Sequence, residues 1–193
     1  MKSALFILLA LSGPAFADDS CSDVSDTAIA AALDDSTAIY NLGVAFYVGK
    51  CVEKSYGRAA YLWDKAARAN VVPAKNNLGY LLFEGLEVEQ DRERAVLLWR
   101  EAAQAGHSEA QVHLGHAVFH GCGTEEDQVQ GLAWVIYATA SAKRRADDPD
   151  GGGGQAIVEM AEEQKAEMLA IAPQVLAAAQ ARTADLDAIE EDR

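Results

Sequence analysis

The twelve residues AKNNLGYLLFEG, at positions 74–85, have two close counterparts in the chain. AIYNLGVAFYVG stands 36 residues earlier, at 38–49, and AQVHLGHAVFHG stands 36 residues later, at 110–121. All three segments begin with alanine, continue with a leucine–glycine pair and end with glycine. Self-similarity at a fixed period of about 20–50 residues indicates a repeat architecture.

Each repeat is expected to form two helices. In the first repeat, Ile39, Leu42 and Phe46 are spaced three and four residues apart, as one helical face requires.

The boundaries of these helices can also be predicted. Glycine readily adopts the left-handed conformation that ends helices, so the first helices should end at Gly49, Gly85 and Gly121. Helix-capping residue types then precede the second helices, at Ser55, Asp91 and Asp127. The second helix of the first repeat should bury Ala59, Leu62, Trp63, Ala66 and Ala67.

The glycine of each leucine–glycine pair falls inside a helix, where it costs about 1 kcal/mol relative to alanine. It nevertheless recurs at Gly43, Gly79 and Gly115. We therefore expect neighbouring helices to approach too closely at these positions for a β-carbon.

The chain also contains segments outside the repeats. Residues 1–17 have the basic start, short apolar run and A-x-A site of a cleaved signal peptide, so we expect a periplasmic or secreted protein. The segments expected after it are an N-terminal half-repeat helix at 18–37, repeats at 38–73, 74–109 and 110–145, a glycine-rich linker at 146–154 and C-terminal capping helices at 155–193. No later segment is long and apolar enough for membrane insertion.

The pattern A-x-x-x-L-G-x-x-aromatic-x-x-G, followed by A-x-x-x-W-x-x-A-A, resembles the Sel-1-like repeat (SLR), which is related to the tetratricopeptide repeat. The resemblance covers residues 30–145 and implies an all-α fold, a right-handed α-solenoid of helix-turn-helix repeats. The third repeat departs from the pattern, because Trp134 stands one position earlier than Trp63 and Trp99 would place it. Members of the family act as adaptors or regulators in protein complexes.

The resemblance further implies a binding site, because the first helices of such arrays line a concave face. By position, that face would carry Tyr40, Val44, Tyr47, Asn76, Tyr80, Phe83, Val112, His116 and Phe119. Aromatic side chains bury a large area on binding, which favours a groove for a peptide or protein. The alternative is that several of these residues only pack between neighbouring helices.

The expected function is therefore that of an exported protein–protein interaction scaffold, an adaptor or regulator. Its partner would be a protein or peptide of the cell envelope, and the chain itself would be a monomer or a weak oligomer. The formal net charge of −14 argues against nucleic acid or an anionic membrane surface as a partner, because both would repel the chain.

A metal site is one alternative. His113, His116 and His120 lie within about 60° on one helix face, and three imidazoles so placed can bind Zn²⁺ or Cu²⁺, with Glu109 as a possible fourth ligand. A solvated polar face gives the same pattern. Under this alternative, the chain would be a periplasmic metal-binding protein that holds the ion through this histidine face. Under the scaffold interpretation, we expect no cofactor.

The three cysteines permit one disulfide in an exported protein. Cys21 and Cys51 should fall at the same end of an antiparallel helix pair, so we predict that they are bonded and that Cys122 is free. No catalytic motif is present, and we do not expect an enzyme. The second alternative function, a β-lactam-acting or cell-wall enzyme, comes only from the resemblance, because some cysteine-rich members of the family are described in that way.

Overall fold

The computed structural model of the chain describes residues 28, 34–144 and 154–191, with the side chains of 187–191 left out. The chain divides into two units, residues 1–90 and 91–193, and each unit is described by itself. The predicted signal peptide, Cys21, most of the half-repeat helix and all of the predicted linker except Gly154 lie outside the described residues.

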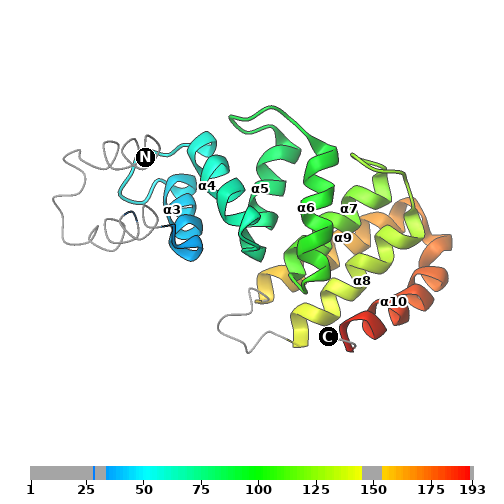
Figure 1. Cartoon of the computed structure of the whole chain (residues 1–193). Coiled ribbons are helices and arrows are strands. Elements are labelled where there is room, and N and C mark those ends of the chain that lie inside the picture. The colour runs from blue at the N-terminus through cyan, green and yellow to red at the C-terminus, as the bar shows by residue number, and fades with distance from the viewer. Residues whose placement is uncertain (1–27, 29–33, 145–153, 192–193) are drawn as a thin grey trace. The chain divides into compact units, whose positions relative to one another are not determined.

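All regular structure in the described residues is helical, which confirms the all-α class (Figure 1). The first unit contains α3 (Ser36–Val48), α4 (Tyr56–Arg68) and α5 (Val72–Glu84). The second unit contains α6 (Arg92–Gln104), α7 (Ser108–His120), α8 (Gln128–Arg144), α9 (Gln155–Ile171), the 3₁₀ turn η3 (Pro173–Val175) and α10 (Leu176–Glu191). Within the units α3 packs on α4, α4 on α5, α6 on α7 and α7 on α8, so the helices pack in sequential pairs.

The local signals that bound these helices are confirmed. Gly49, Gly85 and Gly121 end α3, α5 and α7 with φ angles of 79°, 73° and 65°, in the left-handed region. At the starts of α4 and α6, the side chains of Ser55 and Asp91 accept hydrogen bonds from backbone amides three residues ahead. Asp127 does the same at the start of α8, where its Oδ1 accepts from the Gln130 amide at 2.8 Å.

Two of the three glycines inside the first helices, Gly43 and Gly115, mark close helix contacts, as predicted. A β-carbon at Gly43 would lie 2.5 Å from the Trp63 indole nitrogen, and one at Gly115 would lie 2.6 Å from a methyl group of Val135. Real β-carbons do not approach other heavy atoms so closely, so glycine is needed at both positions. In the third repeat Val135 occupies the place that Trp63 has in the first, which is how the fold accommodates the early Trp134.

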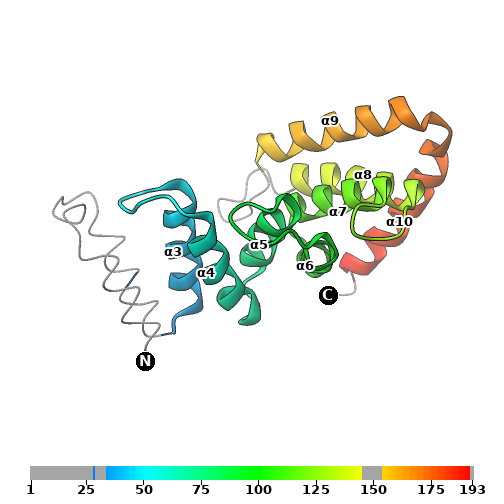
Figure 2. The same ribbon diagram turned by 90° about the horizontal axis from the view of Figure 1, so that it is seen from above.

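The C-terminal helices cover the last repeat, as predicted. Both α9 and α10 pack against α8, and Figure 2 shows α9 running alongside it. Met168 and Ala179, from these two helices, share a buried cluster with residues of α8. As a result Ala133 of α8 is fully buried, whereas Tyr61 of α4 and Leu97 of α6, at the same position in the other repeats, are 54% and 61% exposed.

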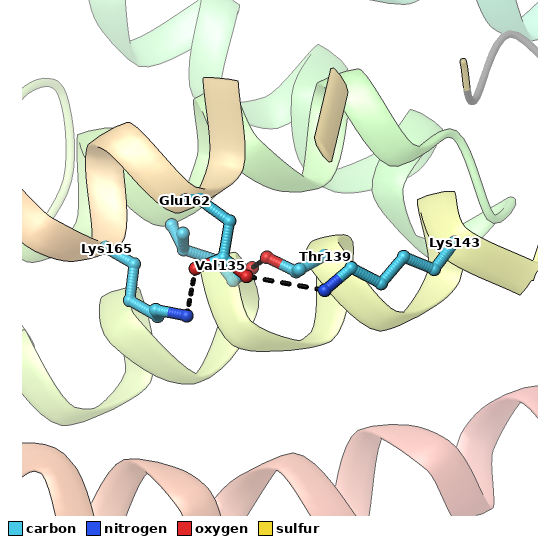
Figure 3. Close-up of polar contacts among 5 residues, drawn as sticks. All are labelled: Val135, Thr139, Lys143, Glu162 and Lys165. Carbon is cyan, nitrogen blue, oxygen red and sulfur yellow. Dashed lines mark hydrogen bonds and ion pairs between the residues drawn. The ribbon is translucent and has the colours of Figure 1, made fainter. Parts of the chain in front are cut away.

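Partly exposed ion pairs lie at the edges of these capping helices. Glu162 of α9 pairs with Lys165 of its own helix and lies 3.5 Å from Lys143 of α8 (Figure 3). These lysines, Lys165 first, lower the pKa of Glu162. On α10, Arg182 donates to Asp127 and Gln130 at the start of α8, at 3.3 and 3.1 Å.

None of the helices described in either unit is long and apolar enough to cross a membrane.

Candidate functional site

The first unit brings together aromatic residues from the three helices that are described in it, α3, α4 and α5. Trp63 of α4 is 1% exposed and lies at the centre of this group. The Tyr40 ring stacks beside it with centroids 6.5 Å apart, and the Tyr47 ring lies 5.4 Å away. The Trp63 indole N–H also donates to the Tyr40 carbonyl at 3.2 Å, which fixes the orientation of the indole. Because Gly43 lets α3 and α4 approach, the tyrosines of α3 rest on a rigid indole.

Tyr56, at the start of α4, belongs to the same group. Its ring centroid is 5.3 Å from that of Tyr47, and the Lys54 ammonium lies 4.6 Å from the Tyr56 centroid and 6.0 Å from the Tyr47 centroid. The hydrogen bond with the Tyr56 hydroxyl raises the pKa of Lys54. Sequence reasoning missed both residues because it looked only at the first helices. The sequence did contain a signal for them: Lys54 and Tyr56 flank Ser55, which is predicted from its residue type to cap the second helix.

Tyr80 of α5 is partly exposed and completes the group. Burial raises the pKa of its hydroxyl, and the Tyr47 phenol, the Glu84 carboxylate and the Tyr56 phenol raise it further. Tyr80 therefore interacts electrostatically with both Tyr47 and Tyr56. We call Tyr40, Tyr47, Tyr56 and Tyr80 the tyrosine surface.

A carboxylate borders the tyrosine surface at the start of α4. Glu87 Oε2 accepts hydrogen bonds from the Gly57 amide at 3.0 Å and from the Ser55 hydroxyl at 3.1 Å. The Gly57 bond, followed by the Ser55 bond, lowers the pKa of Glu87. A negative charge is favourable there because the free amides of a helix N-terminus carry partial positive charge.

The remaining residues predicted for the concave face have mixed positions. Val44 and Phe83 of the first unit and His116 of the second are partly exposed. Asn76, Val112 and Phe119 are at most 2% exposed. Because these three side chains are buried, they are not accessible to a partner. For them the structure agrees with the alternative that some of the residues only pack between neighbouring helices.

The histidines of α7 do not converge on one point. His113 stacks on Trp99 of α6, with centroids 4.9 Å apart, and its Nε2 lies 3.7 Å from Glu109. His116 and His120 instead contact each other, with centroids 4.6 Å apart. In the part of the chain that the structure describes, no group of three or more His, Cys, Asp or Glu residues is placed to hold a metal ion. The sequence predicted that the three imidazoles share one face, but it did not show that His113 stacks on Trp99 while His116 and His120 contact each other.

Cys122, after α7, is a free thiol, as predicted. Cys21 lies outside the described residues, so its bond to Cys51 stays a prediction.

Comparison with known proteins identifies the repeats. The Sel1 repeat family matches residues 36–71, 72–107 and 108–140, with the period found in the sequence and a start two residues earlier. No curated protein matches the chain.

Two solved structures are similar to the chain. A Sel1 repeat protein from Oxalobacter formigenes is 25% identical over 83% of this chain and 71% of that one, with a TM-score of 0.58. The protective antigen c5321 of uropathogenic Escherichia coli strains, which displays an SLR fold, is 28% identical over 92% of this chain and 39% of that one, also with a TM-score of 0.58. This chain therefore spans well under half of the second protein. The three matched repeats cover more than half of the residues of this chain, and the chain belongs to the Sel1 repeat family.

Proposed function

We propose that the chain is an exported scaffold that binds a segment of a partner protein on the tyrosine surface of its first unit. Sel1 repeats typically mediate protein interactions, which sets the class of function. The observation that carries the proposal is the group of tyrosine rings supported by the buried Trp63. Rigid, partly exposed aromatic rings are the side chains most often responsible for binding energy at protein interfaces.

The features of residues 1–17 support export, and the three cysteines fit an oxidising compartment. The structure of the next repeat supports the proposed Cys21–Cys51 bond. A β-carbon built on Gly57 lies 3.8 Å from the Glu87 β-carbon, a separation typical of disulfides, for which the mean is about 3.8 Å. Cys21 and Cys51 stand one period of 36 residues before Gly57 and Glu87. Cys51 and Glu87 also share a left-handed backbone, with φ of 59° and 54°.

The proposed function is tested by capture from a cell-envelope extract followed by chemical cross-linking. The test variant changes Tyr40 and Tyr80 of the tyrosine surface to alanine. The control changes Tyr61, which is 54% exposed on α4, to alanine. We expect the wild type and the Tyr61 variant to capture the same partner and the double variant to lose it. Equal capture by the double variant, with its thermal midpoint unchanged, would rule out this surface as the binding site.

A further inference from the structure

The tyrosine surface already holds a cation, although that cation belongs to the chain itself. The Lys54 ammonium lies 4.6 Å from the centroid of the Tyr56 ring and 6.0 Å from that of Tyr47. These distances fall within the roughly 6 Å at which the negative face of an aromatic ring attracts a cation. A second cation in this unit behaves similarly, since the Arg58 guanidinium lies 5.4 Å from the Phe46 ring.

The charges around this surface also favour a cation. Glu84 acts electrostatically on the Tyr80 hydroxyl, and Glu87 acts on the Lys54 ammonium. The chain as a whole has 30 Asp and Glu residues against 16 Lys and Arg residues, so its long-range field attracts positive partners. A basic segment is therefore the kind of partner that is complementary to both the rings and the carboxylates.

The Lys54 ammonium can leave its place with the loss of one exposed contact, its hydrogen bond with the Tyr56 hydroxyl. It is exposed and lies in the loop between α3 and α4, whereas the rings beneath it are held by Trp63 and the helices. A partner's ammonium or guanidinium group could replace the Lys54 ammonium over the same two rings.

We propose that the tyrosine surface is a docking site for a Lys- or Arg-bearing segment of a partner protein, whose cation replaces Lys54 over Tyr47 and Tyr56. This inference rests on the proposed function and names its partner class. In the free protein Lys54 competes for the site and so weakens binding.

The test uses short fluorescent peptides of alternating lysine and glycine, with glutamine–glycine and glutamate–glycine peptides as matched probes. Their affinities are measured by fluorescence anisotropy for the wild type and for the variants Lys54→Met, Tyr56→Leu and Tyr61→Leu. Lys54→Met keeps an unbranched side chain but removes the charge. Tyr61→Leu is the control for loss of an exposed tyrosine elsewhere on α4. Thermal melts establish that each variant is folded.

We expect the wild type to bind only the lysine peptide, and more weakly as salt is raised, because salt screens exposed charges. Lys54→Met should bind this peptide several-fold more tightly. Tyr56→Leu should bind it roughly 2- to 30-fold more weakly, the range that loss of one cation–π contact implies, and Tyr61→Leu should be unchanged. Equal binding of the glutamine peptide, or a folded Tyr56→Leu variant with undiminished affinity, would overturn the inference.

The two proposals fail in different ways. If the captured partner depends on Tyr40 and Tyr80 while the lysine peptide is indifferent to Lys54 and Tyr56, the cation inference is wrong and the proposed function stands. If neither the partner nor any peptide depends on these residues, the proposed function itself is wrong.

Discussion

Replacing Gly43 by alanine tests whether close helix packing holds the tyrosine surface in place. The new β-carbon would lie 2.5 Å from Trp63 Nε1 and 2.6 Å from Cδ1. These atoms belong to a rigid ring that is 1% exposed, and it cannot move without shifting Tyr40 and Tyr47. The substitution should therefore force α3 and α4 apart.

The magnitude follows from three opposing contributions. Alanine is favoured over glycine in a helix interior by about 1 kcal/mol. Overpacking a buried site costs roughly 1–3 kcal/mol. The displaced indole also loses its hydrogen bond to the Tyr40 carbonyl, which contributes about 1 kcal/mol. We expect Gly43→Ala to lower the free energy of unfolding by about 1–3 kcal/mol.

The assay is urea unfolding followed by far-UV circular dichroism. Gly57→Ala is the matched control, because the atoms nearest its β-carbon are 3.5–3.8 Å away, at ordinary contact distance. That variant should be as stable as the wild type or more stable by up to about 1 kcal/mol. If Gly43→Ala proved as stable as Gly57→Ala, the close-packing explanation of the repeated leucine–glycine pair would be wrong.

Three further predictions concern single contacts. The pKa of Glu87 is lowered on folding, so its ionised form stabilises the fold above the unfolded pKa of about 4.5, and this contribution is lost as the pH falls. Glu87→Gln should therefore lower the thermal midpoint at pH 7 and match the wild type in acid; a difference that persists unchanged in acid would contradict this. A variant that carries Gly57→Cys and Glu87→Cys, made in a Cys122→Ser background, should form a disulfide between the two new cysteines, which non-reducing peptide mapping detects. Free thiols at both positions after oxidation would count against the argument for a Cys21–Cys51 bond. Calorimetric titration with Zn²⁺ should show no stoichiometric binding, because in the described residues no three His, Cys, Asp or Glu side chains are placed to hold the ion. A saturable one-to-one isotherm would contradict this geometry.

The helix pairs could be predicted because their determinants are local in the sequence. Gly49 and its counterparts end helices through their own backbone conformation, and Asp91 and its counterparts cap through a bond three residues ahead. Even the contact of Gly43 with a neighbouring helix was inferred, because an unfavourable residue that recurs must have a packing reason.

The candidate site was predicted only in part, because it depends on how far each helix covers its neighbour. Asn76 and Phe119, like Tyr47 and Tyr80, lie on the first helix of a repeat, yet they are buried. Periodicity assigns residues to a face but does not measure how much of that face another helix covers. Tyr56 joins the site from the second helix, through a contact that exists only after α3 and α4 have packed.

The most direct test of the central claim is site-specific photo-cross-linking. Tyr80 and, in a separate variant, Tyr61 are replaced by a photoreactive benzoylphenylalanine, and both proteins are irradiated in cell-envelope extract. The account predicts a discrete adduct from position 80 that excess lysine–glycine peptide suppresses, and no such adduct from position 61. An adduct from position 61 with none from position 80 would contradict it.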